Sequence, residues 1–491
     1  MTTDQAPPAG TGTTAADSVH SGQRAEHPRR WAAMAVLTAA FMLDLLNATI
    51  VTVALPAVQR GLTASPTQVE WFSAAYLLAF AAALITAARL GDLCGRKRVF
   101  LVGTAVLGLA ALAAGLAPDP TALIAARAVQ GLGAALIAPQ VISILHGIFH
   151  GRERATVFGV FGIAGPFAQS AGLVLGGGLV TADLGALGWR SVFLVSVPVT
   201  AVLVVLGSWL VPESRVADAV RPRWLAAGTL TAGLVAIVFP LLEGRAYGWP
   251  AWTWACLAAG VLAVVGLAAA EHRRPSWRAG ALLPLGLLRR RNIVAGLAVM
   301  LLSFAGFNGF LLVFSLWLQD GQGHGPLAAG LITIVFCAGS LVTAIVVGRL
   351  TTRFGRGTVL VGCLLVAVGT LGLLGPAQAE GAAGVWSLVP GLLVAGAGIN
   401  LVFPALATLY LSAAPPEFAG SASGIYNTAQ QFGASVGVAV LGAVFFAGVD
   451  ASGYASAFTV SVLTVAAALV VSALLSLTLT PHRRGAATGP A

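Results

Sequence analysis

The sequence contains a single lysine, Lys97, among its 491 residues. A Walker A phosphate-binding loop requires a lysine that follows a glycine and precedes a serine or threonine. Lys97 instead lies between Arg96 and Arg98, so the sequence predicts no ATP-binding domain of this kind. If the protein moves a solute against a gradient, the energy must therefore come from the gradient of an ion.

Charged residues are also scarce. They make up 9% of the chain, while hydrophobic residues make up 58% and the mean hydropathy is +0.90. A soluble globular protein has about 25% charged and about 45–50% apolar residues. The composition excludes a large soluble core and indicates a chain that crosses a membrane several times. The 60 glycines agree with this, because small residues let membrane helices approach closely.

The four cysteines are far apart and form no CxxC pair, which argues against a disulfide framework or a zinc site. His146 and His150 are four residues apart, but no further ligand is evident, so we interpret them as solvated loop residues. No cluster of histidine, aspartate or cysteine falls within the apolar runs. The sequence therefore predicts neither an enzyme nor a metal or cofactor site.

Apolar runs of about 20 residues, the length needed to cross a bilayer, recur along the whole chain. We expect fourteen membrane spans. They are 31–55, 69–89, 99–117, 121–146, 155–181, 191–211, 223–243, 250–270, 293–318, 327–349, 358–376, 386–411, 421–447 and 456–480.

The cationic residues are unevenly distributed between the two sides of these spans. An even number of spans puts both termini on one side, where Arg29, Arg30, Arg483 and Arg484 lie. Cationic loops stay on the cytoplasmic side of a membrane, so we expect both termini there. The use of arginine, alanine and glycine in place of lysine and isoleucine is typical of a GC-rich bacterial genome, so we expect the membrane to be the cytoplasmic membrane of a bacterium. The same distribution accounts for the net charge of +10 without a nucleic-acid partner.

Two motifs of the first half recur in the second half about 260 residues later. The run 88–96 is echoed by 348–356, and 131–139 is echoed by 396–404. Such repeats are typical of transporters in which two bundles surround a central cavity. We therefore predict an all-α membrane protein with two six-helix bundles and two extra helices between them. The expected boundaries are 1–28 for a disordered tail, 29–212 for the first bundle, 213–291 for the inserted helices and their loop, 292–481 for the second bundle and 482–491 for the C-terminal tail.

Asp44 is the one acidic residue in the middle of a predicted span, and Arg127 is the one cation so placed. A carboxylate held away from water is costly and can exchange a proton near neutral pH, and a nearby cation can tune that exchange. Asn47 and Gln130 each lie one turn away on the same helix face. We predict that Asp44 and Arg127 couple transport to protons and that Asn47 and Gln130 contact the substrate. The alternatives are that Asp44 caps a helix or bonds a hydroxyl, and that Arg127 snorkels or holds backbone carbonyls.

Isolated polar residues also occur within the apolar runs of the second half. We expect four of them to line a mostly apolar substrate cavity, together with aromatic walls from Phe304, Phe307 and Trp317. The four are Asn308, Asn400, Gln430 and Gln431. A cavity of this composition would suit a lipophilic ligand.

The fifth span is rich in glycine and contains a proline. Small residues at about four-residue spacing form a smooth face for close helix packing, and proline kinks a helix. The positions that we single out are Gly165, Pro166, Gly172, Gly176 and Gly177. This helix either seals the protein against proton leak or simply packs closely against its neighbours, and the sequence leaves both interpretations open.

The loop 89–98 combines an acid, a turn-forming glycine and three consecutive cations between two spans. Asp92 can pair with these cations or with a helix N-terminus. We predict a conformational latch formed by Asp92, Gly95, Arg96 and Arg98.

These motifs resemble, along nearly the whole chain, those of the fourteen-span drug:proton antiporter family of the major facilitator superfamily. The family's G-x-L-a-D-r-x-G-r-k loop is written here from Ala88 to Lys97, with Ala88 in place of the first glycine. Arg127 and Gln130, with the glycines that follow, match the family's fourth-span motif. Trp189 and the residues after it match the family's W-R-x-x-F…P pattern at the sixth span.

Several other positions also depart from the family pattern. In the first span, Asn47 replaces the family's aspartate and Thr52 replaces its asparagine. In the antiporter motif G-x-x-x-G-P-x-x-G-G, which aligns from Ala168 here, Leu173 replaces the proline. Asp44, one turn before Asn47, would then take over the acidic role.

The resemblance implies proton-coupled export of a lipophilic small molecule, such as an antibiotic or several drugs, by a monomer in the lipid bilayer. It implies that the arginine at position 127 takes part in proton transfer. It also implies that Asp92, with Arg96 and Arg98, closes the cytoplasmic gap in the outward-facing state. The substitution at Leu173 leaves a proton-coupled importer of a small metabolite as the alternative.

Overall fold

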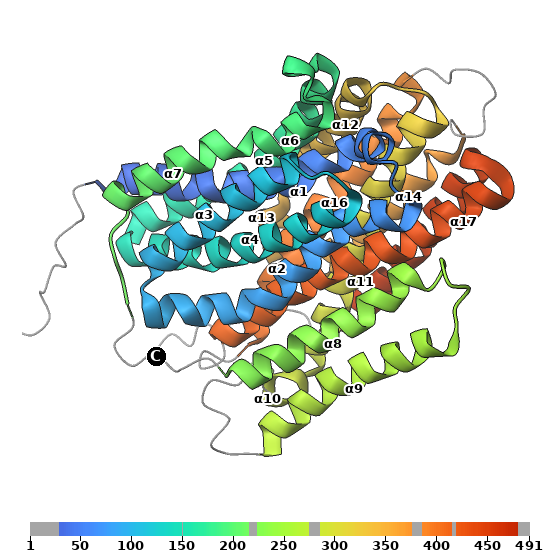
Figure 1. Cartoon of the computed structure of the whole chain (residues 1–491). Coiled ribbons are helices and arrows are strands. Elements are labelled where there is room, and N and C mark those ends of the chain that lie inside the picture. The colour runs from blue at the N-terminus through green and yellow to red at the C-terminus, as the bar shows by residue number, and fades with distance from the viewer. Residues whose placement is uncertain are drawn as a thin grey trace, which may run out of the picture.

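The computed structural model describes residues 29–149, 151–215, 223–273, 285–375, 385–414 and 419–479. Within these ranges the chain is built of helices and contains no β-strand, as predicted. The two predicted tails and His150 lie outside the described residues. In Figure 1 the long helices run side by side across the molecule, which is the arrangement that a bilayer requires, because each helix satisfies its own backbone hydrogen bonds.

The first half of the chain forms one group of packed helices. They are α1 (Arg30–Leu62), α2 (Pro66–Cys94), α3 (Arg96–Gly115), α4 (Pro120–Ile148), α5 (Gly151–Ala182), α6 (Ser191–Leu194) and α7 (Ser196–Leu210). Within the group, α4 packs against α2 and α3, α1 packs against α5, and α7 packs against α3 and α1. We call these helices the first bundle.

The second half forms a corresponding group, the second bundle. It contains α11 (Arg291–Leu316), α12 (Pro326–Ala344), α13 (Val347–Phe354), α14 (Arg356–Leu371), α16 (Val389–Ala413) and α17 (Ala419–Ser476), with the short α10 (Leu285–Leu288) before it. The 58-residue α17 is two antiparallel helices, because Gly453 has a left-handed φ of 81° and a Cβ at Gly448 would lie 2.8 Å from the Cα of Ala457.

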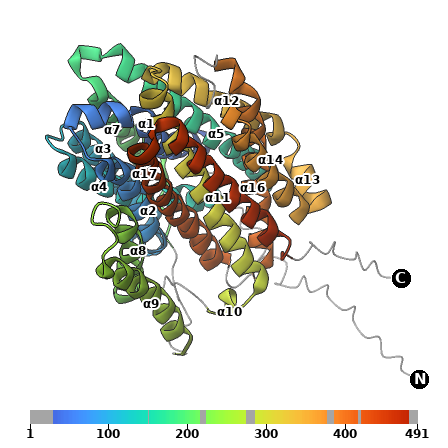
Figure 2. The same cartoon turned by 90° about the vertical axis from the view of Figure 1, so that its right-hand side faces the viewer.

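Two inserted helices lie beside the bundles as a separate pair. They are α8 (Trp224–Glu243) and α9 (Ala251–Arg273), and Figures 1 and 2 both show α9 on the outer side of α8. Only α8 of this pair makes extensive contact with the bundles, through α2 of the first and α17 of the second. The domain boundaries derived from the sequence remain predictions.

The described residues include eleven helices that are long and apolar enough to cross a membrane, and two shorter apolar helices at Phe167–Ala182 and Arg356–Leu371. Counting the two halves of α17 separately gives a total compatible with the fourteen predicted spans. The chain is a multi-pass membrane protein.

The first helix extends beyond the predicted span 31–55. The helix continues through Pro56 to Leu62, since membrane helices tolerate an internal proline where neighbouring helices pack against it. After a three-residue turn, α2 begins with a capping box in which Ser65 and Gln68 satisfy each other's backbone N–H groups. The loop between the two helices is therefore shorter than expected.

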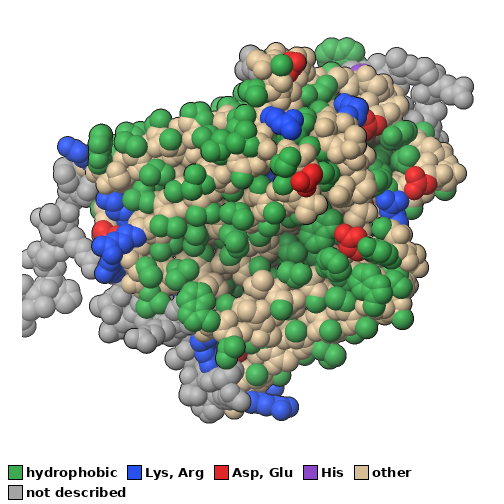
Figure 3. All heavy atoms as spheres, in the orientation of Figure 1, with side chains coloured by type: hydrophobic (Ala, Val, Ile, Leu, Met, Phe, Trp, Pro, Cys, Tyr) green, Lys and Arg blue, Asp and Glu red, His purple; other side chains and the backbone are tan. Residues whose placement is uncertain are grey.

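The predicted internal repeat has a structural counterpart at two helix junctions. Gly95 joins α2 to α3 with φ at 102°, and Gly355 joins α13 to α14 with φ at 53°. Both positions need a backbone conformation that favours glycine. The end of the molecule that holds these two turns is called here the basic end, and Figure 3 shows a group of Lys and Arg side chains there, at the left of the view.

The two bundles touch each other near the other end, which we call the opposite end. Ser315 of α11 donates a hydrogen bond to the carbonyl of Thr52 in α1 (2.9 Å), and Gln319 donates one to the carbonyl of Val53 (2.8 Å). At the rim, Arg60 pairs with Asp320 at 2.8 Å. These contacts hold α1 of the first bundle against α11 and the π turn Trp317–Gly321 that follows it in the second.

Close helix packing predicts an effect that is specific to position. A Cβ at Gly131 of α4 would overlap the carbonyl oxygen of Tyr76 in α2, whereas a Cβ at Gly147 of the same helix meets nothing within 4 Å. We expect Gly131→Ala to destabilise the protein by about 1–3 kcal/mol through overpacking. The control variant Gly147→Ala should leave stability unchanged or slightly raised. Thermal unfolding in detergent measures both, and equal effects of the two substitutions would contradict this view of the α2–α4 contact.

Candidate functional site

Asp44 lies in the interior of the first bundle, with 3% of its surface exposed. Its carboxylate accepts a hydrogen bond from the hydroxyl of Tyr76 in α2. The guanidinium carbon of Arg127 in α4 lies 4.4 Å from the centre of the Tyr76 ring, in a cation–π contact. Tyr76 therefore connects the buried acid of α1 to the buried cation of α4, and no direct ion pair forms between them.

Arg127 is 1% exposed. Its guanidinium donates hydrogen bonds to oxygen atoms of α1, of α2 and of its own helix, α4. Its Nε donates to the carbonyl of Phe72 in α2 at 2.9 Å. Its terminal nitrogen donates to the side-chain oxygen of Gln130 at 2.9 Å and to the carbonyl of Asn47 in α1 at 3.5 Å. A guanidinium suits this role because its donors point in several fixed directions.

The side chain of Asn47 makes hydrogen bonds to three residues near Arg127. Its side-chain oxygen accepts hydrogen bonds from Gln130 (3.3 Å) and from Ser196 of α7 (3.0 Å). Its side-chain nitrogen donates to the carbonyl of Leu43 one turn earlier (2.8 Å). Asn47 and Gln130 are both fully buried. The structure thus brings together Asp44, Arg127, Asn47 and Gln130, and we call these four residues with Tyr76 and Ser196 the polar network.

Tyr76 and Ser196 were missed by the sequence analysis. Each is a single hydroxyl in an apolar run, and a serine in a membrane helix usually bonds its own backbone. For Tyr76 a signal existed, since a buried tyrosine hydroxyl normally finds a partner. The sequence could not name that partner, because Asp44 is on another helix.

The four polar residues predicted in the second bundle do not join the network through any contact in the described part. Asn308 donates to the carbonyl of Phe304 on its own helix (3.2 Å), and Asn400 donates to the hydroxyl of Thr343 (3.3 Å). Gln430 and Gln431 of α17 are half-buried. Their role in substrate binding stays a prediction.

Aromatic rings do gather near Asn308 and Asn400. The rings of Phe304 and Phe403 lie 4.1 Å apart between centres, and Phe307 contacts Phe336 at 5.6 Å. The expectation that Trp317 belongs to the same wall was wrong. Trp317, at the start of the π turn Trp317–Gly321, is 2% exposed and stacks on Phe458 of α17 at 4.3 Å inside the second bundle.

The glycines of α5 allow close contact with two neighbouring helices. A Cβ at Gly172 or Gly176 would overlap atoms of α1, at Thr49 and Ile50 respectively. A Cβ at Gly177 would overlap the carbonyl of Pro326 in α12, across the boundary between the bundles. Gly165 has only a van der Waals neighbour, the side chain of Leu45 at 3.6 Å. The side chain of Pro166 is outside the described residues.

The predicted latch residues form contacts at the basic end. Asp92 of α2 accepts from Arg96, the first residue of α3, at 2.9 Å across the Gly95 turn, and Arg96 also donates to the carbonyl of Ser143 in α4 (3.4 Å). Glu213, just after α7, lies 3.6 Å from Arg98, and a Cβ at Gly95 would meet its carboxylate at 2.6 Å. Glu213 was missed by the sequence analysis. The contacts found for this loop all stay within the first bundle.

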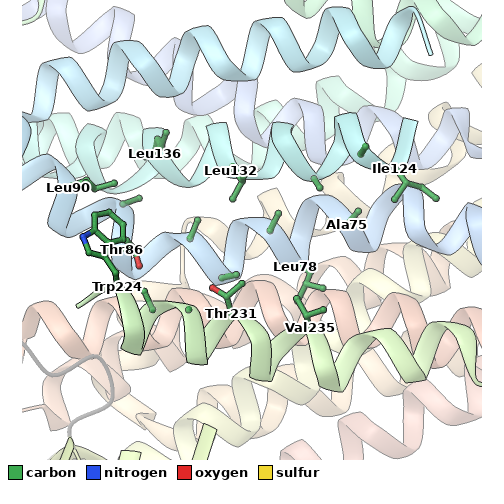
Figure 4. A pocket seen from close by; sticks show the side chains of 18 of the residues that line it. Ala75, Leu78, Thr86, Leu90, Ile124, Leu132, Leu136, Trp224, Thr231 and Val235 are labelled. Atoms are coloured by element: carbon green, nitrogen blue, oxygen red, sulfur yellow. The ribbon is translucent and has the colours of Figure 1, made fainter. Parts of the chain in front are cut away.

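A cavity of about 670 Å³ lies between α2, α4 and α8. Figure 4 shows its apolar walls, with Leu78 and Leu90 from α2, Ile124 from α4, and Trp224 and Val235 from α8. None of the predicted substrate-binding residues lines it. Its few polar groups are threonine hydroxyls and indole nitrogens, so it differs from a substrate site in which charged or amide groups fix the orientation of a ligand.

The sequence as a whole matches one known family. The family model described as Major Facilitator Superfamily matches residues 37–220 and 214–438. The chain belongs to the major facilitator superfamily. Among its relatives in this superfamily is a "probable actinorhodin transporter" of Streptomyces coelicolor, 39% identical over 427 residues that cover 86% of this chain and 73% of the relative. Another is the "puromycin resistance protein pur8" of Streptomyces alboniger, 36% identical over 425 residues that cover 85% and 82%.

Solved structures of the superfamily share the architecture. The xylose transporter XylE from E. coli, in a structure titled as its inward open conformation, superposes with a TM-score of 0.63 at 16% sequence identity, over 93% of this chain and 98% of that one. At this identity the comparison shows the fold alone. The predicted major facilitator fold is confirmed, and the family is one of transporters rather than enzymes.

Proposed function

We propose that this protein exports a lipophilic small molecule of the antibiotic type across the bacterial cytoplasmic membrane, in exchange for protons that enter the cell. The observation that supports this best is the polar network, an acid and a cation buried together in a membrane helix bundle. The names of the relatives, a probable actinorhodin transporter and a puromycin resistance protein, support export of a drug-like molecule. The apolar and aromatic character of the second bundle suits such a substrate.

The network provides a place where a proton and a conformational change can be linked. With a proton on Asp44, the carboxyl and the Tyr76 hydroxyl form a neutral pair, and Arg127 is held by carbonyl and amide oxygens. When the proton leaves, the new negative charge attracts Arg127 across the Tyr76 ring. Loss of the proton thus changes the balance of contacts between α1, α2 and α4. Each entering charge supplies about 2.3 kcal/mol per 100 mV of membrane potential.

In this proposal the basic end faces the cytoplasm, as its cationic side chains favour. The bundles are then closed to the outside, through the contacts of α1 with α11. The latch residues contact only the first bundle in the described part, which fits an inward-facing state. In the outward-facing state, Asp92, Arg96 and Arg98 would contact the second bundle instead.

The direction in which the substrate moves distinguishes this function from the alternative, a proton-coupled importer. Expressed in a pump-deficient bacterium, the protein should raise the tolerated dose of some lipophilic antibiotics and lower the accumulation of lipophilic dyes. An uncoupler should abolish both effects, because it removes the proton gradient. Higher accumulation of the same compounds in expressing cells would contradict export and support the importer alternative.

The closed opposite end gives a second test of the cycle. In a variant with Cys94→Ser, the pair Arg60→Cys and Asp320→Cys should be joined by a short cleavable thiol crosslinker, since the native side chains form an ion pair. We expect crosslinking to stop transport and reduction to restore it, because the outside cannot open while α1 is tied to α11. The control pair Arg30→Cys and Glu153→Cys replaces an ion pair within the first bundle, and its crosslinking should leave transport intact. Full transport by the crosslinked 60–320 pair would contradict alternating access at this end.

A further inference from the structure

The apolar cavity of about 670 Å³ between α2, α4 and α8 has no part in the proposed exchange of substrate for protons. It is a groove, because α4 and α8 both pack against α2 but make no extensive contact with each other in the described part. Leu132 of α4, on its wall, is 43% exposed, whereas Arg127 and Gln130 of the same helix are buried on the inner side. The groove therefore opens toward the lipid, and what fills it in a membrane comes from the bilayer.

Small side chains make the groove deep. Its floor on α2 carries an alanine at every fourth residue, at Ala75, Ala79, Ala83 and Ala87, a spacing that keeps them on one side of the helix. On the facing wall of α8, a Cβ at Gly228 would meet nothing within 4 Å. Apolar walls that lack neighbouring atoms lose dispersion contacts, so a hydrocarbon chain lying between them is stabilised. The volume is in the range of sites that hold a specific ligand.

At the basic end the groove meets a cation and an indole N–H. Trp224, the first residue of α8, is exposed and lines the groove there, and Figure 4 shows its ring beside Thr86 and Leu90. Arg89 precedes Leu90 and lies two turns after the lining residue Ala82, on the same side of α2. It is half-buried, and its guanidinium makes no hydrogen bond or ion pair with the described residues. Such donors suit a phosphate group.

The two ends of the groove differ, which gives an occupant a direction. At the opposite end, the indole nitrogen of the lining residue Trp71 already donates to the carboxylate of Glu243 at 2.8 Å. At the basic end, Arg223 just before α8 adds a second cation, although Glu271 of α9 lies 3.9 Å from it. Basic pockets between membrane helices on the cytoplasmic side bind anionic lipid headgroups, and the orientation proposed above puts the basic end on that side.

We propose that this groove binds one anionic phospholipid, with an acyl chain between α2, α4 and α8 and its phosphate held by Arg89 and the indole N–H of Trp224. The acyl chain fills the space that separates α4 from α8. The lipid thereby holds the inserted helix pair against the first bundle. The site does not depend on the substrate or on the direction of transport, so its failure would leave the proposed function standing.

The headgroup part of the proposal is tested by comparing two lipids. Protein stripped of lipid in detergent is titrated with phosphatidylglycerol or with phosphatidylcholine, and bound lipid is counted by native mass spectrometry. We expect the wild type to bind one phosphatidylglycerol about tenfold more tightly than phosphatidylcholine, the difference that one charge-assisted hydrogen bond makes. Arg89→Gln should remove this preference. The control Arg349→Gln changes an exposed arginine at the equivalent position of the internal repeat, on α13, and should keep the preference.

Filling the groove tests the position of the acyl chain. A Cβ at Gly228, or at Gly266 on the lipid-facing α9, meets nothing within 4 Å, so both positions have room for a side chain. Gly228→Phe should lower phosphatidylglycerol binding by tenfold or more, and the control Gly266→Phe should leave it unchanged. The thermal midpoint of each variant without lipid reports whether it is folded, and Arg89→Gln tests the proposal even if Gly228→Phe is not.

Three results would overturn the proposal. Equal phosphatidylglycerol binding by Gly228→Phe and Gly266→Phe would show that the lipid lies elsewhere. Equal affinity of the wild type for the two lipids would show that the site does not select an anionic headgroup. Displacement of the bound lipid by a transported dye, at the concentration that saturates transport, would make the groove a substrate site instead.

Discussion

Replacing Asp44 by asparagine should abolish proton-driven efflux, reducing resistance and dye extrusion to the level of cells that lack the protein. Asparagine has nearly the shape of aspartate and can still accept from the Tyr76 hydroxyl, so the fold and the α1–α2 contact should persist. What it cannot do is bind and release a proton. Transport in everted vesicles, driven by an imposed pH gradient, measures the loss directly.

Two controls make the result for Asp44→Asn specific. Asp119→Asn changes an exposed acid that caps α4 through a hydrogen bond to Ala122, and asparagine is an equally good cap. This variant should transport like the wild type. In addition, Asp44→Asn should still exchange labelled for unlabelled substrate across the vesicle membrane without a gradient. If Asp44→Asn kept full pH-driven transport, another group would be the proton site.

Removing the charge of Arg127 should be nearly as severe and should also weaken the fold. Arg127→Gln leaves buried carbonyls of Phe72 and Asn47 without their donor and removes the cation beside the Tyr76 ring. Loss of one partner from a buried charged network costs about 3–5 kcal/mol. We expect a lower thermal midpoint in detergent and no measurable proton-driven transport.

The conservative variant Arg127→Lys separates charge from geometry. A lysine keeps the positive charge but cannot donate in the several directions that Arg127 uses. We expect it to transport about tenfold more slowly, the equivalent of one charge-assisted hydrogen bond of about 1.5 kcal/mol. Arg190→Gln is the matched control, since Arg190 also stacks on an aromatic ring at 4.4 Å and donates to a carbonyl, but outside the network. Equal losses in Arg127→Gln and Arg190→Gln would argue against a special role for the buried cation.

The sequence was informative about which residues lie inside the membrane region. Asp44 and Arg127 were recognised because an acid and a cation within apolar runs are rare, and burial is the physical reason for that rarity. Asn47 and Gln130 followed from helical spacing. The structure then placed all four within one network. The order of residues along the chain could not have shown which helices pack against each other.

The residues that were missed are those whose importance depends on a neighbour in space. The residues around Tyr76 in the sequence are those of any tyrosine in an apolar helix. Only the position of Asp44 in space gives its hydroxyl a partner. The first predicted span ended at residue 55, before Pro56, whereas the packed neighbours of α1 allow the helix to continue through this proline to Leu62.

The central claim is that Asp44 holds a proton that substrate displaces, and one measurement tests it most directly. Purified protein in detergent and weak buffer is mixed with a transported dye, and the protons released into solution are followed with a pH indicator for the wild type and for Asp44→Asn. We predict release by the wild type, and a smaller release by Asp44→Asn, which lacks the acid, at the same occupancy of dye. Equal proton release by the two proteins would show that Asp44 is not the group that exchanges a proton for substrate.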